Sequence, residues 1–400
     1  MARVLVIGAG IAGCSVAWHL SKRHQVTVLE HAELPGAEAS AQNAGMVRLL
    51  GEDPAERALA IRTQRWLQHP DSDWCRDELS HVTGAVLGLA HDPLHLHDGV
   101  AHLSAHGVEV RSVQGAELSA VAPALSDAPL QQAWWLPEAR VVDPHALVQG
   151  FIRGLRRQGG ALRCGVAVQE VLSRDGRVAG VRCAGELIEA DAVVLAAGAW
   201  SAPLAQTAGV ERPLYPLRRT LLTARVEQAP AAGHPWCWID DEGVYFRPES
   251  GGWLMSACDE RLDPPQRLGG SRGAPQPHER ALLHDKLQRL VPRLAGVVSQ
   301  GGWSGLRTFA ADRSPMLGPE PMVDGLWWAT GLGGYGVTCS YGVGEALAQW
   351  FDDAPPSWLH LDGVRPDRHA LGRFPIRPTG QLHRPRLVDA RLLGRLRGRP

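Results

Sequence analysis

The sequence predicts a mixed α/β protein, α+β overall, and three observations support this class. The apolar run from Val4 to Ile7 is typical of a strand buried on both faces, as in a parallel sheet. Glycines follow it at positions 8, 10 and 13, and the stretch after them is long enough for a helix. Residues 217–256 instead contain short strand-like segments without a helical period. We therefore expect a parallel-sheet domain that carries an inserted antiparallel sheet.

The opening glycines have the spacing G-x-G-x-x-G, and each has a physical role. Gly8 permits a tight turn, Gly10 lets a pyrophosphate approach the backbone, and Gly13 lets the helix lie close to the strand. The diphosphate would bind the free N–H groups at the start of that helix. A second apolar run, 26–29, ends in Glu30, which is placed to accept hydrogen bonds from ribose hydroxyls. This order of elements predicts a Rossmann-like dinucleotide-binding domain.

Composition narrows the class of protein further. The 400 residues suit two domains or one large interleaved unit, and a net charge of −1 gives no reason to expect nucleic acid as a partner. The seven cysteines are scattered without a C-x-x-C pair, which fits a reducing compartment without disulfides or a zinc site. We see neither a secretory signal nor an apolar run of the ~20 residues that a membrane helix needs. We expect a cytoplasmic protein, and its oligomeric state is left open.

Several histidines cluster between positions 91 and 106. His95 and His97 would share one face of a strand, so a metal site is conceivable there. However, Pro and Gly interrupt the region, and neither cysteines nor clustered carboxylates accompany the histidines. We interpret them as solvated side chains and expect no metal site.

The rest of the chain alternates predicted helices and strands. Further helices are expected at 54–67, 115–125, 144–158, 280–290 and 337–351, and further strands at 83–90, 134–135, 166–168, 180–183, 192–197 and 326–330. The strand at 326–330 leads into the glycine-rich turn 331–336 and a helix, so a second helix N-terminus is expected to face a ligand. We expect a discontinuous cofactor domain (1–85, 140–215 and 300–375), a sheet domain (86–139 and 216–299) and an Arg-rich extension (376–400).

Taken together, five stretches resemble the flavin-dependent D-amino acid oxidase family, which includes glycine oxidase, sarcosine oxidase and D-amino acid dehydrogenases. They are 8–30, 40–45, 194–201, 305–318 and 331–336, and the resemblance spans about residues 1 to 375. It implies a Rossmann-like FAD-binding domain roofed by an antiparallel substrate-binding sheet, with FAD held noncovalently.

The resemblance also implies which residues contact the cofactor. Gly8, Gly10 and Gly13 would bind the diphosphate, Glu30 the adenosine ribose, and the Val168 backbone the adenine. The segment beside the flavin ring would be Ser40, Asn43, Ala44 and Gly45, and the pyrimidine side would face Gly333, Gly334, Tyr335, Gly336, Val337 and Thr338. Ile11, Ala12, His31 and Gly198 complete the expected cofactor contacts.

The implied reaction is oxidation of the C–N bond of a small amino acid or secondary amine. A hydride would pass from the substrate carbon to flavin N5, and the imine would then hydrolyse in water. Because the cofactor supplies the difficult chemistry, we assign no side chain as a catalytic acid or base. Arg307 lies where the family places the guanidinium that binds the substrate carboxylate, and Tyr245 would line the same pocket. Arg218 and Arg219 are the alternatives for the carboxylate.

Three departures from the family pattern refine these expectations. Gly305 stands where covalent members have a cysteine, so no covalent flavin link is expected. Leu254 stands where oxidases have a lysine that activates oxygen, which favours a dehydrogenase or a slow oxidase. The electron acceptor would be oxygen, or a quinone or other electron carrier. No acidic residue occurs around Ala85, which argues against a strongly cationic substrate.

Three other functions remain open from the sequence. A 2-hydroxy acid dehydrogenase of the same fold would need a general base, such as His145 or another histidine in the pocket. A flavin-binding subunit of a larger electron-transfer complex is a second alternative. An NAD-only dehydrogenase is the third.

Overall fold

The computed structural model of the protein describes residues 1–70, 74, 79–92, 94, 96–231, 233–265 and 273–368. His95 and the Arg-rich stretch 376–400 lie outside the described residues. Within these ranges, no group of three or more His, Cys, Asp or Glu side chains is arranged to hold a metal ion. The helices in the same ranges are too short or too polar to cross a bilayer.

The first layer is a six-stranded sheet with β1 (Arg3–Ile7) near its centre. In spatial order its strands are β19 (Met316–Pro319), β20 (Leu326–Thr330), β12 (Ala192–Leu195), β1, β2 (Gln25–Leu29) and β8 (Ala161–Arg163). All pairs are parallel except β19 with β20. Val6 pairs with Val28 on one side and with Val194 on the other, and all three side chains are fully buried. The apolar runs of the sequence are therefore the centre of a doubly covered sheet.

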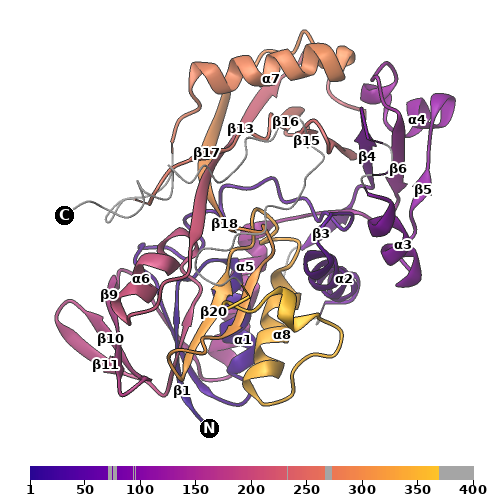
Figure 1. Ribbon diagram of the computed structural model, residues 1–400. Helices are drawn as coiled ribbons and strands as arrows, with labels where there is room; N and C mark the ends of the chain where they lie inside the picture. Colours follow the sequence, from indigo (N-terminus) through magenta and orange to yellow (C-terminus); the bar gives the residue numbers. More distant parts are fainter. Residues whose placement is uncertain are drawn as a thin grey trace.

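Helices cover one face of this sheet and a small sheet covers the other (Figure 1). The helical layer consists of α1 (Ile11–Leu20), α5 (Pro144–Arg157), α8 (Ser340–Phe351) and α2 (Pro54–Gln68), and α1 packs against both α5 and α8. On the other face lie β9 (Val168–Arg174), β10 (Arg177–Cys183) and β11 (Glu186–Glu189), with α6 (Ser201–Thr207) beside them. Leu5 and Val193 of the six-stranded sheet belong to the same buried cluster as Val181 of β10, which is the core on this face.

The second layer is a nine-stranded sheet that is antiparallel apart from one parallel pair. Its strands are β17 (Arg261–Leu262), β13 (Leu214–Arg225), β16 (Gly252–Ser256), β15 (Val244–Glu249), β14 (Trp236–Ile239), β4 (Ala85–Leu89), β6 (Gln132–Leu136) and β5 (Arg111–Ser112), with β18 (Gly301–Ala310) paired to β13. The parallel pair is β14 with β4. Figure 1 shows this sheet above the parallel one, with α7 (Pro277–Leu290) across its outer face. Leu283 and Leu287 of α7 pack there against Phe246.

Smaller elements complete the chain. They are the helices α3 (His97–Ala105) and α4 (Gly115–Val121), the two-stranded sheet of β3 (Ser80–Val82) and β7 (Arg140–Val142), and the 3-10 turns η1 (Pro123–Leu125), η2 (Gly198–Trp200), η3 (Pro292–Leu294) and η4 (Leu361–Gly363). Several predicted boundaries were wrong: the helix expected at 115–125 ends at Val121, and the strand expected at 166–168 is β9, which begins at Val168. Two further helices begin elsewhere than expected. The helix expected at 280 begins at Pro277, because Glu279 accepts the backbone N–H of Gln276 and caps it. The helix expected at 337 begins at Ser340, after turns that continue the glycine-rich loop.

The strands of the two sheets come from different parts of the sequence. No strand within 216–262 joins the six-stranded sheet in the described part of the chain. Strand β18, which the prediction assigns to the cofactor domain, pairs with β13 over ten positions, from Leu214 with Ala310 to Thr223 with Gly301. The boundaries of the two domains remain a prediction, and β18 connects them.

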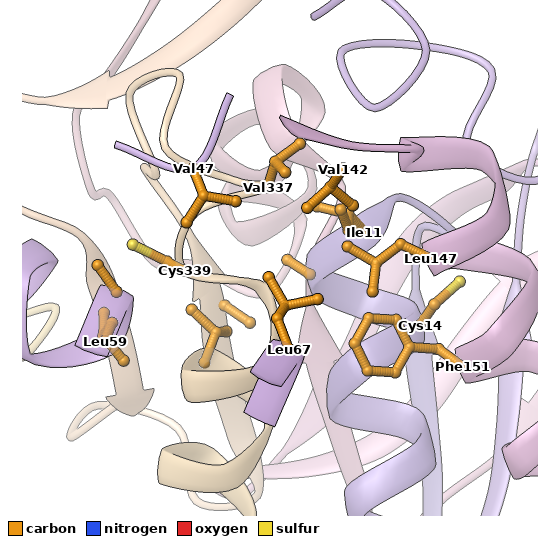
Figure 2. Packing of buried hydrophobic residues seen from close by; sticks show 14 of the residues in the cluster. Ile11, Cys14, Val47, Leu59, Leu67, Val142, Leu147, Phe151, Val337 and Cys339 are labelled. Carbon is orange, nitrogen blue, oxygen red and sulfur yellow. The ribbon is translucent and has the colours of Figure 1, made fainter. Parts of the chain in front are cut away.

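The main core continues from α1 to the glycine-rich loop at the end of the fold. Figure 2 shows Ile11 and Cys14 of α1 with Phe151 of α5 and with Val337, and all of these belong to one buried cluster. The first turn of α1 and the loop before α8 are therefore fixed against the same core. This packing places two helix N-termini near each other.

Candidate active site

A cavity of about 800 Å³ opens at the carboxyl ends of the parallel strands. Ile7, Leu29 and Ala196 line it from the ends of β1, β2 and β12, and Ala329 lines it from β20. This edge is where open α/β sheets bind their ligands, because the loops that follow the strands converge there. The volume is in the usual range for a site that encloses most of a small ligand.

The glycine loop leaves the backbone bare at one wall of the cavity. Gly8 has φ +102°, and a Cβ on it would lie 2.7 Å from the carbonyl oxygen of Ala196. A Cβ on Gly13 would lie only 2.0 Å from the carbonyl oxygen of Gly8. Gly10 is the N-cap of α1, and Gly10, Ile11 and Ala12 line the cavity. The positive end of the helix therefore faces the space where a diphosphate would bind.

Glu30 lines the cavity and accepts a hydrogen bond from the glycine loop. Its Oε2 accepts the backbone N–H of Ala9 at 2.7 Å, and its Oε1 accepts that of Ala32 at 2.9 Å. His31 Nδ1 lies 3.2 Å from the same Oε1. Oε2 accepts from one donor in the described chain and has a further lone pair, so Glu30 can still accept from a ribose hydroxyl.

The small polar segment after residue 39 forms another wall. Ser40 Oγ accepts the backbone N–H of Ile11 at 2.8 Å and so caps the first turn of α1. Asn43 Oδ1 accepts the N–H of Gly45 at 2.7 Å, and Gly45 has φ +68°. The carbonyl oxygen of Ala44 accepts from Arg247 Nε at 2.7 Å. These bonds fix a loop of small side chains, which leaves room for a flat ring.

The second glycine-rich loop packs directly on β18. Gly333 donates its N–H to the carbonyl oxygen of Thr308 at 2.9 Å. Cβ atoms on Gly333 and Gly334 would lie 2.6 Å from the Phe309 ring and 2.9 Å from Arg307. Both glycines have positive φ, so the loop can approach β18 only without side chains. Thr338 Oγ1, at the end of the loop, donates to the carbonyl oxygen of Met46.

Arg307 brings an uncompensated positive charge to the cavity. Its Nη2 donates to the hydroxyl of Tyr245 at 3.3 Å, and no Asp or Glu oxygen lies within 4.0 Å of it among the described residues. The side chain is half-buried, lines the cavity and crosses the gap between β18 and β15. A guanidinium in this position can bind a carboxylate through two parallel hydrogen bonds.

The two alternative arginines are engaged elsewhere. Arg218 Nε donates to Asp263 Oδ2 at 2.6 Å, and Arg219 Nη2 donates to Glu260 Oε1 at 2.8 Å. Neither lines the cavity. Both arginines therefore connect β13 to residues 260–263, which follow β16 in the chain.

Most of the residues expected to contact the cofactor do line the cavity. Those on its wall are Gly8, Gly10, Ile11, Ala12, Glu30, His31, Ser40, Asn43, Val168, Gly198, Gly333, Gly334, Gly336 and Val337. Five lie behind the wall instead: Gly13, Ala44, Gly45, Tyr335 and Thr338. Tyr245 is also behind it and reaches the site through Arg307. Their roles toward a ligand remain predictions.

Sequence reasoning missed several residues here. Gln42, Trp200, Glu170 and Arg182 line the cavity without having been predicted. Arg48 is buried directly behind the loop before α8, where its backbone N–H donates to Thr338 Oγ1 at 3.0 Å. One signal could have found it: Arg48 is a single charge inside the apolar run 46–50, and a charge in a buried run requires a partner.

The glycine loop, the acid after β2 and the cavity at the strand ends define a dinucleotide-binding oxidoreductase. The model of the DAO family, described as "FAD dependent oxidoreductase", matches residues 3–350. The chain therefore belongs to the DAO family of FAD dependent oxidoreductases, and it is an enzyme.

Named relatives lie at moderate sequence distance. The chain is 28% identical over 425 residues to a D-amino acid dehydrogenase from Paramagnetospirillum magneticum, and the match covers 92% of this chain and 98% of that protein. Among solved structures, L-proline dehydrogenase from P. horikoshii has a TM-score of 0.80 at 20% identity, with 92% and 97% of the two chains covered. Glycine oxidase from Geobacillus kaustophilus has a TM-score of 0.77 at 22% identity, with 92% and 100% covered. These structures share the fold.

The residues of the cavity fit FAD. Gly8 and Gly10 line the cavity at a helix N-terminus suited to the diphosphate, and the missing side chains of Gly8 and Gly13 let the strand, the loop and the helix pack closely there. Glu30 and the second glycine loop both line the same cavity, so one cofactor could contact both. Backbone N–H donors for the diphosphate, a carboxylate acceptor for a ribose and small side chains beside a flat ring are what such a cofactor requires.

Proposed function

We propose that this enzyme oxidises the C–N bond of a small amino acid or secondary amine, and that Arg307 holds the substrate carboxylate. The single observation that carries the proposal is the Arg307 guanidinium, which lines the FAD cavity without an acidic partner in the described chain. The names of the relatives support it, since they are dehydrogenases and oxidases of amino acids. Buried or half-buried cations normally have a partner, so a free one in a cavity indicates an anionic ligand.

Tyr245 would complete the carboxylate site. Its hydroxyl oxygen accepts from Arg307, so its own O–H remains available as a donor. The remaining N–H groups of Arg307 and the O–H of Tyr245 can then bind the two oxygens of one carboxylate. Tyr245 is almost fully buried and does not itself line the cavity, so its hydroxyl would meet the carboxylate beside the Arg307 guanidinium.

The chemistry divides between cofactor and protein. FAD, when bound, supplies a two-electron acceptor for the hydride that leaves the substrate carbon. The protein orients the substrate through its carboxylate, and the substrate amine must be unprotonated so that its lone pair can stabilise the developing positive charge. No side chain has to act as a general base during hydride loss, because an amine that binds unprotonated has no proton to give up first. The resulting iminium then hydrolyses in water. Positioning is the main contribution of this chain.

We further propose that FAD is bound without a covalent link. No cysteine occurs in the described lining of the cavity. A Cβ at Gly305 would lie 1.9 Å from Gln42 Oε1, so this position is packed and carries no nucleophile. Burial and the nearby Glu30 raise the pKa of Cys14, on the first turns of α1, well above its ordinary value, and this thiol stays protonated.

The electron acceptor is proposed to be a quinone or other electron carrier rather than oxygen. Oxidases of the family would use a lysine near the flavin to activate oxygen, so the positions of the lysines matter here. The sequence contains two lysines, Lys22 and Lys286. Lys22 lies over the Trp18 ring, and Lys286 donates to the carbonyl oxygens of Gly243 and Ala257. Neither lines the cavity, and Leu254 is buried in the sheet.

The geometry gives less support to a 2-hydroxy acid dehydrogenase. Such an enzyme needs a base near the carbon that is oxidised. His145 is exposed at the start of α5, and His31 is the histidine of the described lining, where it lies beside Glu30.

A panel of reductants mixed anaerobically with the yellow enzyme tests this proposal. The panel contains glycine, proline and both enantiomers of alanine and phenylalanine, with lactate and N-methylbutylamine as controls. We expect an amino acid to bleach the flavin absorbance much faster than either control. Bleaching by lactate alone would favour the hydroxy acid alternative. Equal bleaching by the amine that lacks a carboxylate would contradict the role of Arg307.

A further inference from the structure

A buried ion pair lies where the antiparallel sheet meets the loop before α8. Arg48 Nη2 donates to Asp240 Oδ1 at 2.6 Å, and Arg48 Nε donates to the carbonyl oxygen of Leu50 at 3.0 Å. Arg48 is 6% exposed and Asp240 is fully buried. Truncating one partner of such a pair would leave the other charge buried, so the guanidinium is held firmly in place.

Two aromatic rings lie against the guanidinium of Arg48. Its Cζ is 4.3 Å from the centroid of Trp238 on β14 and 5.3 Å from that of Tyr335 in the glycine-rich loop. Both distances are within the range of cation–π attraction, which is stronger where water is excluded. The contact with Arg48 therefore restricts the movement of the Trp238 ring.

The other neighbour of Trp238 is Tyr245. The two residues are directly paired across β14 and β15, and their ring centroids are 4.6 Å apart at an interplanar angle of 36°. Tyr245 has two rotatable side-chain torsions, and a packed aromatic neighbour restricts both. Since the hydroxyl of Tyr245 accepts from Arg307, the stack determines where that hydroxyl lies.

We propose that Trp238 is a positioning residue for substrate binding: held by Arg48, it orients the Tyr245 hydroxyl toward Arg307 and so presets the carboxylate site. This rests on the proposed function, because it assumes that Arg307 and Tyr245 bind the substrate carboxylate. Arg48, Trp238, Asp240 and Tyr245 do not line the cavity, so their effect passes through the bond between Tyr245 and Arg307, which does line it.

This role differs from ordinary core packing in one measurable way. If Trp238 acts only through the Tyr245 hydroxyl, its removal has little further effect once that hydroxyl is gone. A purely structural role would instead give independent effects that multiply. A double-mutant cycle therefore separates the two.

The test uses the holoenzyme and the amino acid that bleaches the flavin fastest in the panel. Anaerobic stopped-flow gives the apparent dissociation constant and the limiting rate of flavin reduction for wild type, Trp238→Leu, Tyr245→Phe and the double variant. We expect Trp238→Leu to raise the dissociation constant about tenfold, in line with the loss of one oriented hydrogen bond to a charged group, and to change the limiting rate less than about threefold. In the Tyr245→Phe background the same change should add less than about twofold.

Trp236→Leu is the matched control, because Trp236 is buried on the same strand and in the same cluster but has no ring contact with Tyr245 in the described chain. It should leave the dissociation constant within about twofold of wild type. If Trp238→Leu fails to fold, Trp238→Phe takes its place: it retains a ring and should bind substrate within about threefold of wild type. An effect of Trp236→Leu or Trp238→Phe as large as tenfold would overturn the proposal.

Multiplicative effects in the double variant, about a hundredfold in total, would also overturn it. If Arg307→Ala left the dissociation constant unchanged, the proposed carboxylate site itself would be wrong. An unchanged constant in Trp238→Leu, with Arg307→Ala impaired, would refute the positioning role alone.

Discussion

Glu30 Oε2 accepts the backbone N–H of Ala9 at 2.7 Å, across 21 residues of sequence. Through this bond the carboxylate connects the end of β2 to the loop between Gly8 and Gly10. The same group faces the cavity, so one side chain shapes the cofactor site and also lines it. A change at this position should affect FAD binding before it affects substrate binding.

Glu30→Ala should weaken FAD retention. The variant leaves the buried N–H of Ala9 without its acceptor, which costs about 1–3 kcal/mol, and it also removes the predicted ribose contact. The measurement is the ratio of flavin absorbance to protein after gel filtration. Glu186→Ala, at an exposed position of β11, is the control and should retain FAD as wild type does. Full FAD retention by Glu30→Ala would contradict the assigned role.

Gly13→Ala should destabilise the holoenzyme although alanine is the better helix former. The new Cβ would lie 2.0 Å from the carbonyl oxygen of Gly8, and neither backbone can yield easily. We expect a loss of about 1–3 kcal/mol in the free energy of unfolding, the usual cost of overpacking. Gly296→Ala, where a Cβ would meet nothing within 4 Å, provides the comparison and should be nearly neutral. Equal stability of the two variants in denaturant titrations would refute the close contact.

The opening unit could be predicted from sequence because its determinants are local. The strand, the glycine spacing, the helix and Glu30 all lie within 30 residues, and each has one steric or electrostatic reason. The resemblance also located Arg307 and Tyr245. Their contact spans 62 residues of sequence, and spacing alone could not have brought them together.

The remaining features depend on long-range pairing. Arg218 and Arg219 remain the alternatives for the carboxylate, but each bonds an acid that the local sequence does not indicate, Asp263 and Glu260 respectively. The ion pair of Arg48 with Asp240 joins segments 192 residues apart. The local sequence around Arg48 does not indicate that Asp240 is its partner, and the reverse is also true. The sequence could therefore show at most that Arg48 needs an acidic partner.

A buried histidine predicts a specific loss of stability in acid. Burial lowers the pKa of His19 to about 3, and its Nε2 has no hydrogen-bond partner in the described chain. The unfolded chain binds this proton near pH 6.5, so His19 costs nothing above that pH and destabilises the fold as the pH falls from 6.5 toward 3. Between pH 7 and pH 5 the wild type should lose about 2 kcal/mol more than His19→Gln. Parallel pH profiles of the two proteins, measured by urea unfolding with excess FAD, would contradict this.

Noncovalent binding makes a simple prediction for acid-denatured enzyme. Because no cysteine lines the described cavity, precipitation with trichloroacetic acid should release all of the flavin into the supernatant. The readout is the absorbance and fluorescence of supernatant and pellet. Yellow colour that stays with the washed pellet would disprove the noncovalent link.

The central claim is that Arg307 binds the substrate carboxylate, and one substitution tests it most directly. Losing one partner of a desolvated charge pair usually costs about 2–5 kcal/mol, so Arg307→Ala should raise the apparent substrate dissociation constant roughly 30-fold or more. FAD content should be unchanged, and Arg307→Lys should restore binding only in part, because an ammonium cannot form two parallel hydrogen bonds. The measurement is anaerobic flavin reduction against substrate concentration for wild type, both Arg307 variants, Arg218→Ala and Arg219→Ala. A 30-fold weaker substrate affinity in Arg307→Ala with full FAD content is the predicted result; unchanged affinity there, together with lost binding in Arg218→Ala or Arg219→Ala, would contradict the claim and assign the carboxylate to β13.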